Sequence, residues 1–361
     1  MRKKWLALAL SLTMVAGCLT GCGGSDSTTS NTNSGSSSND SAKVETLADG
    51  GGKVLNIYVW NDEFSSRFEK YYPNYDKSTK SIGDVKVNFI QNANEGNNYQ
   101  DKLDAALKAQ DSASADDKVD MFLCEMDYVN KYTNTDKALD VKALGLTDED
   151  MSQMYDYTKQ AATGADGVLR GVSWQGCPGV LFYNREAAKE VLGTDDPDEV
   201  QKYVKDWDTF NDTAKKMKDA GYKMTSSVND SYRVYSNNVS TKWVNDGKIT
   251  IDDNIMKRVE DSKALYDAKE TSSAELWSDD WKKGFYPDGK VFCYFGPAWL
   301  VNFSMAADTK GSIGYEGGWG AAQGPQGFFW GGTWICAAQG TDNASLIKDI
   351  MLKMTTDDDI M

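Results

Sequence analysis

The sequence predicts an α/β protein built as two lobes, on three observations. Strand-like and helix-like segments alternate from residue 54 to residue 125. The chain has 361 residues, enough for two globular units that each bury a core. The segment 167–183 holds two strand-like pieces separated by a Gly/Pro break at 176–179, which is typical of a chain that crosses from one lobe to the other.

The first strand is predicted at 54–59, where apolar residues alternate along the chain as in a strand with one buried face. It ends at Trp60, and polar residues that include Asn61 and Glu63 precede a helix beginning near Phe64. Ligands of open α/β sheets bind at such strand-to-helix turns. We therefore treat this turn as a candidate binding segment. The alternative is that Trp60 only packs beneath the helix.

The remaining elements of the first lobe follow in the same alternation. A strand is predicted at 84–91, a helix from Asn97, and a strand at 119–124 that is apolar almost throughout, as in a strand buried on both faces. Strand, helix, strand, helix, strand in this order predicts a doubly wound sheet of parallel strands.

Helices dominate the segment from 184 to about 285. We expect them at 184–193, at 207–221 and from 253 or 254 onward. A strand at 291–295 follows, then a glycine-dense stretch and a further apolar strand, and a helix at 344–354 comes last.

Residues 1–22 have the pattern of an export signal, with a basic start and an apolar stretch too short to span a membrane. Cys18 and Cys22 each follow small residues, in boxes that resemble those of bacterial lipoproteins, whose cysteine is acylated after cleavage. We expect lipidation at Cys22, with Cys18 as the alternative. An ordinary secretory signal is the other interpretation. The Ser/Gly/Asn-rich segment 23–52 is predicted to be a flexible tether.

Charge and composition exclude several classes of function. Lys and Arg number 39 against 54 Asp and Glu, a net charge of −15 that repels nucleic acids and anionic lipid surfaces. The sequence has no histidine, which disfavours a zinc site and Ser-His-Asp catalysis. We therefore expect no nucleic-acid partner, no metal and no cofactor.

Four cysteines remain after the signal: Cys124, Cys177, Cys293 and Cys336. Outside the cell they could form two disulfides in three possible pairings. Each lies in or beside an apolar strand, where a free buried thiol is the commoner state. We favour free thiols.

Several segments are similar, in order and spacing, to those of one protein family. They are the lipoprotein signal, the strand ending at Trp60, Leu181-Phe182-Tyr183-Asn184, Trp207-Asp208, Gly296-Pro297-Ala298-Trp299 and Gly331-Gly332-Thr333-Trp334-Ile335. Together they resemble the family 1 extracellular solute-binding proteins, the maltose-binding-protein-like receptors of carbohydrate ABC importers. The resemblance covers about 53–361.

This resemblance implies a two-lobe, periplasmic-binding-protein-like (type II) fold, with hinge strands and mostly parallel sheets flanked by helices. Lobe 1 would comprise 53–175 and 313–361, and lobe 2 would comprise 176–312. Family members usually continue past the helix that comes last here, so we expect that helices of lobe 2 are missing from this sequence.

A sugar receptor needs flat aromatic rings to cover the faces of the sugar, and carboxylates and amides to bind its hydroxyls. The ends of successive predicted strands supply this mixture. The candidate ligand-binding residues are Trp60, Asn61, Glu63, Asn94, Glu125, Asp127, Trp174, Gln175, Trp299 and Trp330. By resemblance, Trp299 matches the stacking tryptophan of lobe 2 in the family's Gly-Pro-Trp segment.

Each candidate has a purely structural alternative. The carboxylates could be exposed turn residues. Trp207 and Trp334 are assigned to packing, and Trp243, Trp277 and Trp281 are assigned to helix surfaces or packing between the lobes.

The sequence thus predicts a binding protein and not an enzyme. It would capture a sugar, an oligosaccharide by preference, and deliver it as a monomer to the permease subunits of an ABC importer, while lipid-anchored at the outer face of the cytoplasmic membrane. An exported glycosidase with two carboxylates stays open as an alternative. A receptor for a peptide, a polyamine or an anion is a further alternative. The absence of a basic cluster near the predicted strand ends disfavours an anion.

Overall fold

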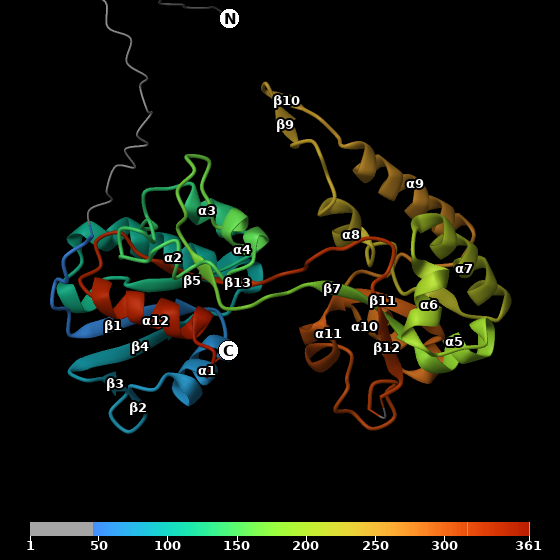
Figure 1. Ribbon diagram of the computed structural model, residues 1–361, viewed down its shortest axis with the longest axis horizontal. Helices are drawn as coiled ribbons and strands as arrows, with labels where there is room; N and C mark the ends of the chain where they lie inside the picture. Colours follow the sequence, from blue (N-terminus) through green and yellow to red (C-terminus); the bar gives the residue numbers. More distant parts are fainter. Residues whose placement is uncertain (1–45, 316, 361) are drawn as a thin grey trace, which may run out of the picture. The chain divides into compact units, whose positions relative to one another are not determined.

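The computed structural model describes residues 46–315 and 317–360, which belong to one compact unit. Two large β-sheets, each with its own helices, and one small two-stranded hairpin form the described part of this unit (Figure 1). We call the seven-stranded sheet and its helices lobe 1, and the four-stranded sheet and its helices lobe 2. The predicted signal, its candidate lipidation sites Cys18 and Cys22, and most of the predicted tether lie outside the described residues.

Lobe 1 contains a sheet with the strand order β2-β3-β4-β1-β5-β13-β6. The strands are β1 (Val54–Val59), β2 (Tyr75–Asp76), β3 (Ser81–Ile82), β4 (Val85–Gln91), β5 (Met121–Glu125), β6 (Val172–Ser173) and β13 (Thr333–Ala337). The helices are α1 (Glu63–Tyr71), α2 (Asn98–Ala109), α3 (Val129–Thr133), α4 (Asp156–Ala161) and α12 (Ala344–Thr356), with 3-10 turns η1 (Glu95–Asn97), η2 (Gln110–Ser112) and η3 (Ala115–Asp117).

Both faces of the lobe 1 sheet are covered. Along β5, Met121 and Leu123 pack with α1 and α12 on one face, whereas Phe122 and Cys124 pack with α2 and α3 on the other. This arrangement explains why the segment is apolar at every position, since each side chain of a doubly covered strand is buried. It also places Glu125, at the C-terminal end of β5, on the side of the sheet where the parallel strand β1 ends.

Lobe 2 contains a sheet with the strand order β12-β7-β11-β8. Its strands are β7 (Gly179–Asn184), β8 (Lys223–Thr225), β11 (Val291–Pro297) and β12 (Trp319–Ala322), and a separate hairpin is formed by β9 (Val244–Asn245) and β10 (Lys248–Ile249). The helices are α5 (Arg185–Leu192), α6 (Pro197–Val204), α7 (Trp207–Asp219), α8 (Tyr232–Ser236), α9 (Asp253–Asp267), α10 (Asp279–Lys282) and α11 (Ala298–Phe303), with turns η4 (Lys283–Phe285) and η5 (Pro287–Gly289).

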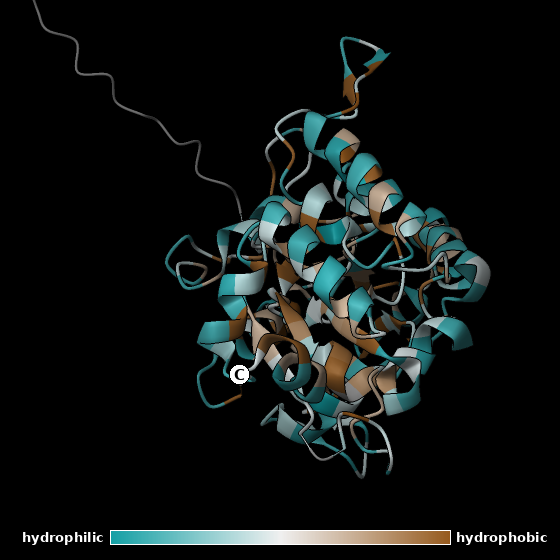
Figure 2. Cartoon of the chain, turned by 90° about the vertical axis from the view of Figure 1, so that its right-hand side faces the viewer, coloured by the Kyte–Doolittle hydropathy of each residue, from teal (hydrophilic) through white to brown (hydrophobic). Residues whose placement is uncertain are grey.

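Local sequence signals account for the helix ends in lobe 2. The side chain of Asn184 accepts hydrogen bonds from two backbone N–H groups at the start of α5, and Gly193 ends that helix with φ +80°. Asp206 and Thr209 form a reciprocal capping box at the start of α7. Figure 2 shows the apolar strands of this lobe inside and polar helix faces outside. The predicted helices of this region are confirmed.

Two segments connect the lobes. The chain passes from β6 in lobe 1 to β7 in lobe 2, and returns from β12 to β13. The two connections are hydrogen-bonded to each other, because Trp330 N donates to Cys177 O at 3.1 Å and Gly179 N donates to Phe328 O at 2.8 Å. Figure 1 shows them running side by side between the sheets. The return to lobe 1 comes after Ala322, later than the boundary at 313 that the sequence suggests.

The strand directions correct one detail of the predicted fold. Only β4, β1 and β5 form a parallel set in lobe 1, and β13 pairs with β5 and β6 in the antiparallel sense. In lobe 2, β7 is antiparallel to both of its neighbours. The sheets are therefore mixed and not mostly parallel. The physical reason is that β7 and β13 enter from the other lobe and not through a crossover helix, which a parallel neighbour requires.

The four cysteines of the described chain are free and buried, as the sequence favoured. Cys124 Sγ and Cys336 Sγ lie 4.0 Å apart on neighbouring strands. Within the described ranges, no helix combines the length and the apolar character needed to cross a membrane.

Candidate ligand-binding pocket

A cavity of about 440 Å³ is lined by residues from both lobes and from the connections between them. Lobe 1 contributes the residues that follow β1 and β5. Lobe 2 contributes the segment around the start of α8, the turn before α10, and α11. The lining residues are Trp60, Asn61, Glu63, Glu125, Asp127, Gln175, Asn229, Asp230, Tyr232, Arg233, Leu276, Trp277, Trp299, Phe303, Trp330, Gly331, Gly332 and Thr333.

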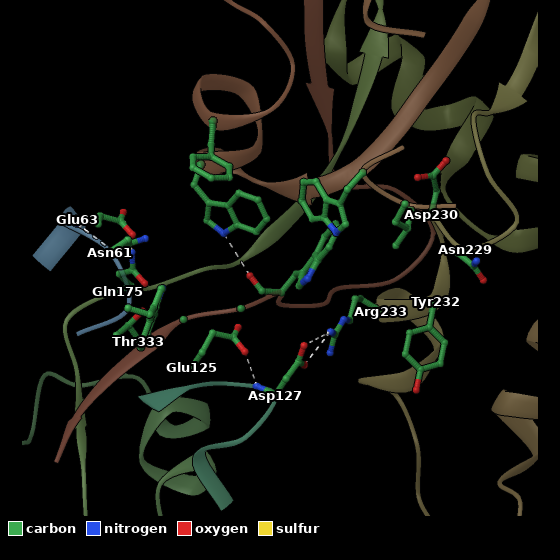
Figure 3. Close-up of a pocket in the computed structure, with 18 residues that line it drawn as sticks. Asn61, Glu63, Glu125, Asp127, Gln175, Asn229, Asp230, Tyr232, Arg233 and Thr333 are labelled. Atoms are coloured by element: carbon green, nitrogen blue, oxygen red, sulfur yellow. Dashed lines mark hydrogen bonds and ion pairs between the residues drawn. The ribbon is translucent and has the colours of Figure 1, made fainter. Parts of the chain in front are cut away.

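Three polar residues of lobe 1 form one group at one end of the pocket (Figure 3). Asn61 Oδ1 accepts a hydrogen bond from the backbone N–H of Glu63 at 3.1 Å, at the start of α1. Gln175 Nε2, from the connection after β6, donates to Glu63 Oε1 at 3.2 Å. Trp60 lies beside them and packs edge-on against Tyr99, with ring centroids 5.4 Å apart. The segment directly after β1 thus supplies the indole ring of Trp60, the amide of Asn61 and the carboxylate of Glu63.

Three indole rings of lobe 2 and its connections face the same cavity. Trp277 lies 6.2 Å from Trp299 with nearly parallel planes, and 5.5 Å from Trp330. Trp299 Nε1 donates to the backbone carbonyl of Trp330 at 3.3 Å, which fixes the orientation of the Trp299 ring. Phe303 packs edge-on against Trp299, and its side chain is 79% exposed. The result is a wall of aromatic rings that continues from inside the cavity to its rim.

Glu125 lies at the end of β5 and faces this wall. Its Oε2 accepts a hydrogen bond from the backbone N–H of Asp127 at 2.6 Å. Burial raises the pKa of Glu125 to about 7, because desolvation disfavours the charged carboxylate. The backbone N–H of Asp127 opposes this shift, whereas the charge of the Asp127 side chain adds to it. Arg233 lowers the pKa of Glu125 by a smaller amount.

One ion pair joins the two lobes within the pocket. Arg233 Nη2, on α8, donates to both carboxylate oxygens of Asp127, at 2.8 and 3.0 Å (Figure 3). The guanidinium group of Arg233 also lies 6.0 Å from the ring of Trp330. Arg233 is thus held by a carboxylate of lobe 1 and by an aromatic ring of the return connection.

Asp230 is buried at the far side of the pocket. Its carboxylate accepts hydrogen bonds from Trp281 Nε1 at 2.6 Å and from the backbone N–H of Ser227 at 2.7 Å. Desolvation nevertheless raises the pKa of Asp230 to about 7. In the part of the chain that the structure describes, no group of three or more His, Cys, Asp or Glu side chains is arranged to hold a metal ion.

A family model for bacterial extracellular solute-binding proteins matches residues 71–360. The chain belongs to this family. Members are binding proteins found outside the cytoplasm, so the predicted class of protein is confirmed and the predicted export agrees with the family. No curated protein sequence matches the chain.

Solved structures with the same fold include relatives that were crystallised with sugars. An extracellular solute-binding protein of family 1 has a TM-score of 0.67 at 20% identity, covering 82% of this chain and 73% of that one. The ABC-transporter-associated binding protein of B. animalis subsp. lactis Bl-04, in complex with β-1,6-galactobiose, has a TM-score of 0.58 at 20% identity, covering 86% and 73%. The galacto-N-biose/lacto-N-biose I-binding protein of Bifidobacterium longum, in complex with lacto-N-biose, has a TM-score of 0.62 at 16% identity, covering 87% and 77%. At these identities the likeness shows the fold, the two-lobe architecture of periplasmic binding proteins.

The structure brings most of the candidate residues of this solute-binding protein to one cavity. Those that line it are Trp60, Asn61, Glu63, Glu125, Asp127, Gln175, Trp299 and Trp330. They come from segments that lie far apart in the sequence, on both lobes. Their contact with a ligand stays a prediction.

Two candidates do not line this cavity. Asn94 is exposed at the start of η1. Trp174 is only 7% exposed and packs in the lobe 1 core, 5.6 Å from the ring of Phe64 and beneath the guanidinium group of Arg67. The chain bends at Trp174 directly after β6, and the Trp174 ring packs against Phe64 of α1 whereas Gln175 lines the cavity.

Other lining residues were not among the sequence candidates. Trp277 was assigned to a helix surface or to packing between the lobes, but it lies in the aromatic wall of the pocket. Asn229, Asp230, Tyr232 and Arg233 were not selected at all. Their signal is a short run of polar, aromatic and basic residues that leads into the start of α8, and the sequence does not show that this run lies close to β5 in space. Trp207 and Trp334 are buried, as the packing assignment requires.

Proposed function

We propose that this solute-binding protein captures an oligosaccharide outside the cell and delivers it, chemically unchanged, to the permease subunits of an ABC importer. The observation that carries the proposal is a single cavity in which indole rings of Trp277, Trp299 and Trp330 face carboxylate and amide groups of lobe 1. Aromatic rings cover the apolar faces of a sugar, and carboxylates and amides bind its hydroxyl groups.

The division of these groups between lobes supports capture by closure. Sugars bury little apolar area, so tight binding needs contacts from both sides. Most of the aromatic rings belong to lobe 2 and its connection, whereas Asn61, Glu63 and Glu125 belong to lobe 1. A ligand that contacts both sets binds the closed state better than an open state and shifts the protein toward it. The importer then distinguishes loaded protein from empty protein by this difference.

The arrangement of the pocket carboxylates supports binding better than it supports glycoside hydrolysis. Hydrolysis would need two carboxylates flanking a glycosidic bond, one as acid and one as base or nucleophile. Asp127 is bound by Arg233, and Asp230 is held by Trp281 and Ser227. Glu63 contacts Arg67 and Gln175, which leaves Glu125 as the one pocket carboxylate without a partner side chain among the described residues. Relatives of the same fold are binding proteins whose structures are in complex with β-1,6-galactobiose and lacto-N-biose. We therefore propose binding without turnover.

We also propose that the protein acts as a monomer, tethered by a lipid on Cys22 and the flexible segment 23–52. A lipidated cysteine followed by a solvated linker would keep the receptor close to the importer while leaving it free to rotate. Labelling of Cys22 with a lipid precursor, with Cys18→Ser and Cys22→Ser variants compared, tests this part. Full membrane association of Cys22→Ser protein would place the anchor elsewhere.

The main experiment is a thermal-shift screen against a panel of oligosaccharides, followed by analysis of the bound sugar after incubation. We expect a rise in melting temperature with a subset of the panel, and recovery of intact ligand. Shortened products would identify a hydrolase instead. A shift with peptides or polyamines, and with no sugar, would move the protein to another class of receptor.

A further inference from the structure

We propose that the preferred carbohydrate carries a protonated amine, bound between the carboxylate of Glu125 and the indole rings of the pocket. This inference rests on the proposed function and names the substrate class within it. Three observations support this inference: the charges of the side chains that line the pocket, the carboxylate oxygen of Glu125 that faces the cavity, and the indole rings beside it.

The pocket has an excess of carboxylates. Four line it, namely Glu63, Glu125, Asp127 and Asp230, against the guanidinium group of Arg233. Arg233 is already occupied by Asp127, and Glu63 has Arg67 at 3.5 Å. Among the residues that the structure describes, Glu125 and Asp230 form no ion pair. Two pocket carboxylates therefore lack an ion-pair partner among the described residues, although the charge of Arg233 acts on Glu125 from a distance.

Of these two, Glu125 is the one available to a ligand. Both oxygens of Asp230 accept hydrogen bonds, from Trp281 and Ser227. Glu125 uses Oε2 for the backbone of Asp127, while its Oε1 accepts no hydrogen bond from the side chains that line the cavity. A partly buried carboxylate oxygen therefore faces the cavity with no donor from a side chain.

The space beside this oxygen is open because residue 331 is glycine. A Cβ built on Gly331 would have Glu125 Oε1 as its nearest neighbour at 3.5 Å, and atoms of the Trp299 indole at 3.8 and 3.9 Å. The carboxylate and the indole ring thus border one unfilled space. A ligand group there would touch an acceptor oxygen on one side and an aromatic ring on the other.

A protonated amine matches this space better than a hydroxyl group. Both can donate a hydrogen bond to Glu125, but closure over a neutral sugar would bury the carboxylate further without a counter-charge, which is costly. An ammonium group supplies the counter-charge and a charge-assisted hydrogen bond, and indole rings attract cations through their faces. Burial raises the pKa of Glu125 to about 7, because desolvation disfavours the charged carboxylate, and an ammonium group beside it would favour the ionised form.

The test compares sugars that differ only at one substituent. Glucosamine is paired with glucose, galactosamine with galactose, and the β-1,4-linked glucosamine trimer with cellotriose and with the N-acetylated trimer. Affinities are measured by calorimetry at pH 6.5 and low salt, with spermidine as an amine that lacks a sugar ring. We expect at least one amino sugar to bind about tenfold to a hundredfold more tightly than its neutral partner, the usual range for a hydrogen bond to a charged group.

Two variants test whether Glu125 causes the preference for the amino sugar. Glu125→Gln should reduce the ratio between the amino sugar and its neutral partner to about twofold or less, because the amide keeps the shape and loses the charge. Asp101→Asn removes one carboxylate from the exposed surface of α2, and it should leave the ratio as in the wild type. An equal drop in both variants would mean a long-range effect of net charge and would overturn the role of Glu125.

Proton release gives a readout that does not depend on a folded variant. An ammonium group next to Glu125 favours its ionised form, so binding of the amino sugar should release protons from the wild-type protein, and binding of the neutral partner should release fewer. The charged groups that act on Glu125 are Asp127 and Arg233, and Glu63 and Asp230 line the same cavity. Equal proton release with both sugars would contradict the inference.

The outcomes separate this inference from the proposed function. Tighter or equal binding of the neutral sugars would overturn the preference for an amine and leave sugar capture standing. Failure of every sugar, neutral or amino, would overturn both. Spermidine binding as tightly as the best amino sugar would overturn the assignment of a carbohydrate while supporting a cationic ligand.

Discussion

Arg233 and Asp127 hold the two lobes together across the pocket, through hydrogen bonds of 2.8 and 3.0 Å from one guanidinium nitrogen to both carboxylate oxygens. The two residues are 106 positions apart, one on α8 of lobe 2 and the other just after β5 of lobe 1. The side chain of Asp127 is 58% exposed, so water and salt screen this pair.

We expect the ion pair to contribute modestly to the closed state. Asp127→Asn and Arg233→Gln, alone and combined, should give a coupling energy of about 0.2–1 kcal/mol in ligand affinity, the range of exposed pairs. The coupling should shrink in high salt. Asp212→Asn, which breaks an ion pair within α7, is the matched control and should leave affinity unchanged. Independent effects of the two pocket variants would mean that the pair does not stabilise closure.

Trp299 and Trp60 provide the next prediction, because they line the pocket from different lobes. Replacing either with alanine should weaken sugar binding by about 1–3 kcal/mol through loss of a buried aromatic face. We add Trp277→Ala, for which the structure indicates an effect of the same size. Trp243, which is 52% exposed and does not line the cavity, is the control. Isothermal titration calorimetry on the four variants measures their sugar affinities. Unchanged affinity in the Trp299, Trp60 and Trp277 variants would place the site elsewhere.

Trp174 is expected to act on stability. Its ring packs 5.6 Å from Phe64 in the lobe 1 core, so Trp174→Ala should lower the free energy of unfolding by about 3–5 kcal/mol. Trp174→Phe fills part of the volume and should recover part of this loss. Affinity measured on the folded fraction should stay close to that of the wild type. Loss of affinity with normal melting behaviour would restore Trp174 as a ligand contact.

Asp230 should make stability depend on pH. Burial raises its pKa from 3.8 to about 7 in the folded state. Between these values the folded protein binds the proton more tightly than the unfolded chain, so the contribution of Asp230 to stability is greatest at low pH and falls as pH rises toward 7. Melting temperatures across pH 4–7.5 should therefore decline less steeply in Asp230→Asn than in the wild type. The slope is the decisive measurement, because the amide also alters the hydrogen bonds to Trp281 and Ser227. Parallel slopes would contradict the assignment.

The cysteines give a chemical prediction. Cys124, Cys177, Cys293 and Cys336 are buried and free, so a thiol reagent should label none of them in the folded protein at short times. After unfolding without reductant, all four should react. Mass spectrometry reads the number of labels. Two or fewer labels on the unfolded, unreduced chain would indicate a disulfide.

Part of the fold follows from local signals in the sequence. Alternation along 54–59 and the apolar run before Glu125 specify strands, because side chains alternate along a strand and a doubly covered strand is apolar throughout. Asn184 and Gly193 bound a helix through their own hydrogen bonding and backbone freedom. These effects act over a few residues, so they can be predicted without knowledge of the tertiary fold.

Strand direction, side-chain direction and the full membership of the pocket depend on the tertiary structure. The return of the chain from lobe 2 makes β13 antiparallel, and the geometry of the first connection turns Gln175 into the cavity and Trp174 into the core. The sequence by itself determined which segments end in aromatic and polar side chains, and that these suit a sugar. Only the tertiary structure decided that Trp277 and Arg233 join them, because contacts between residues so far apart in the chain follow from how the two lobes pack and not from any local pattern.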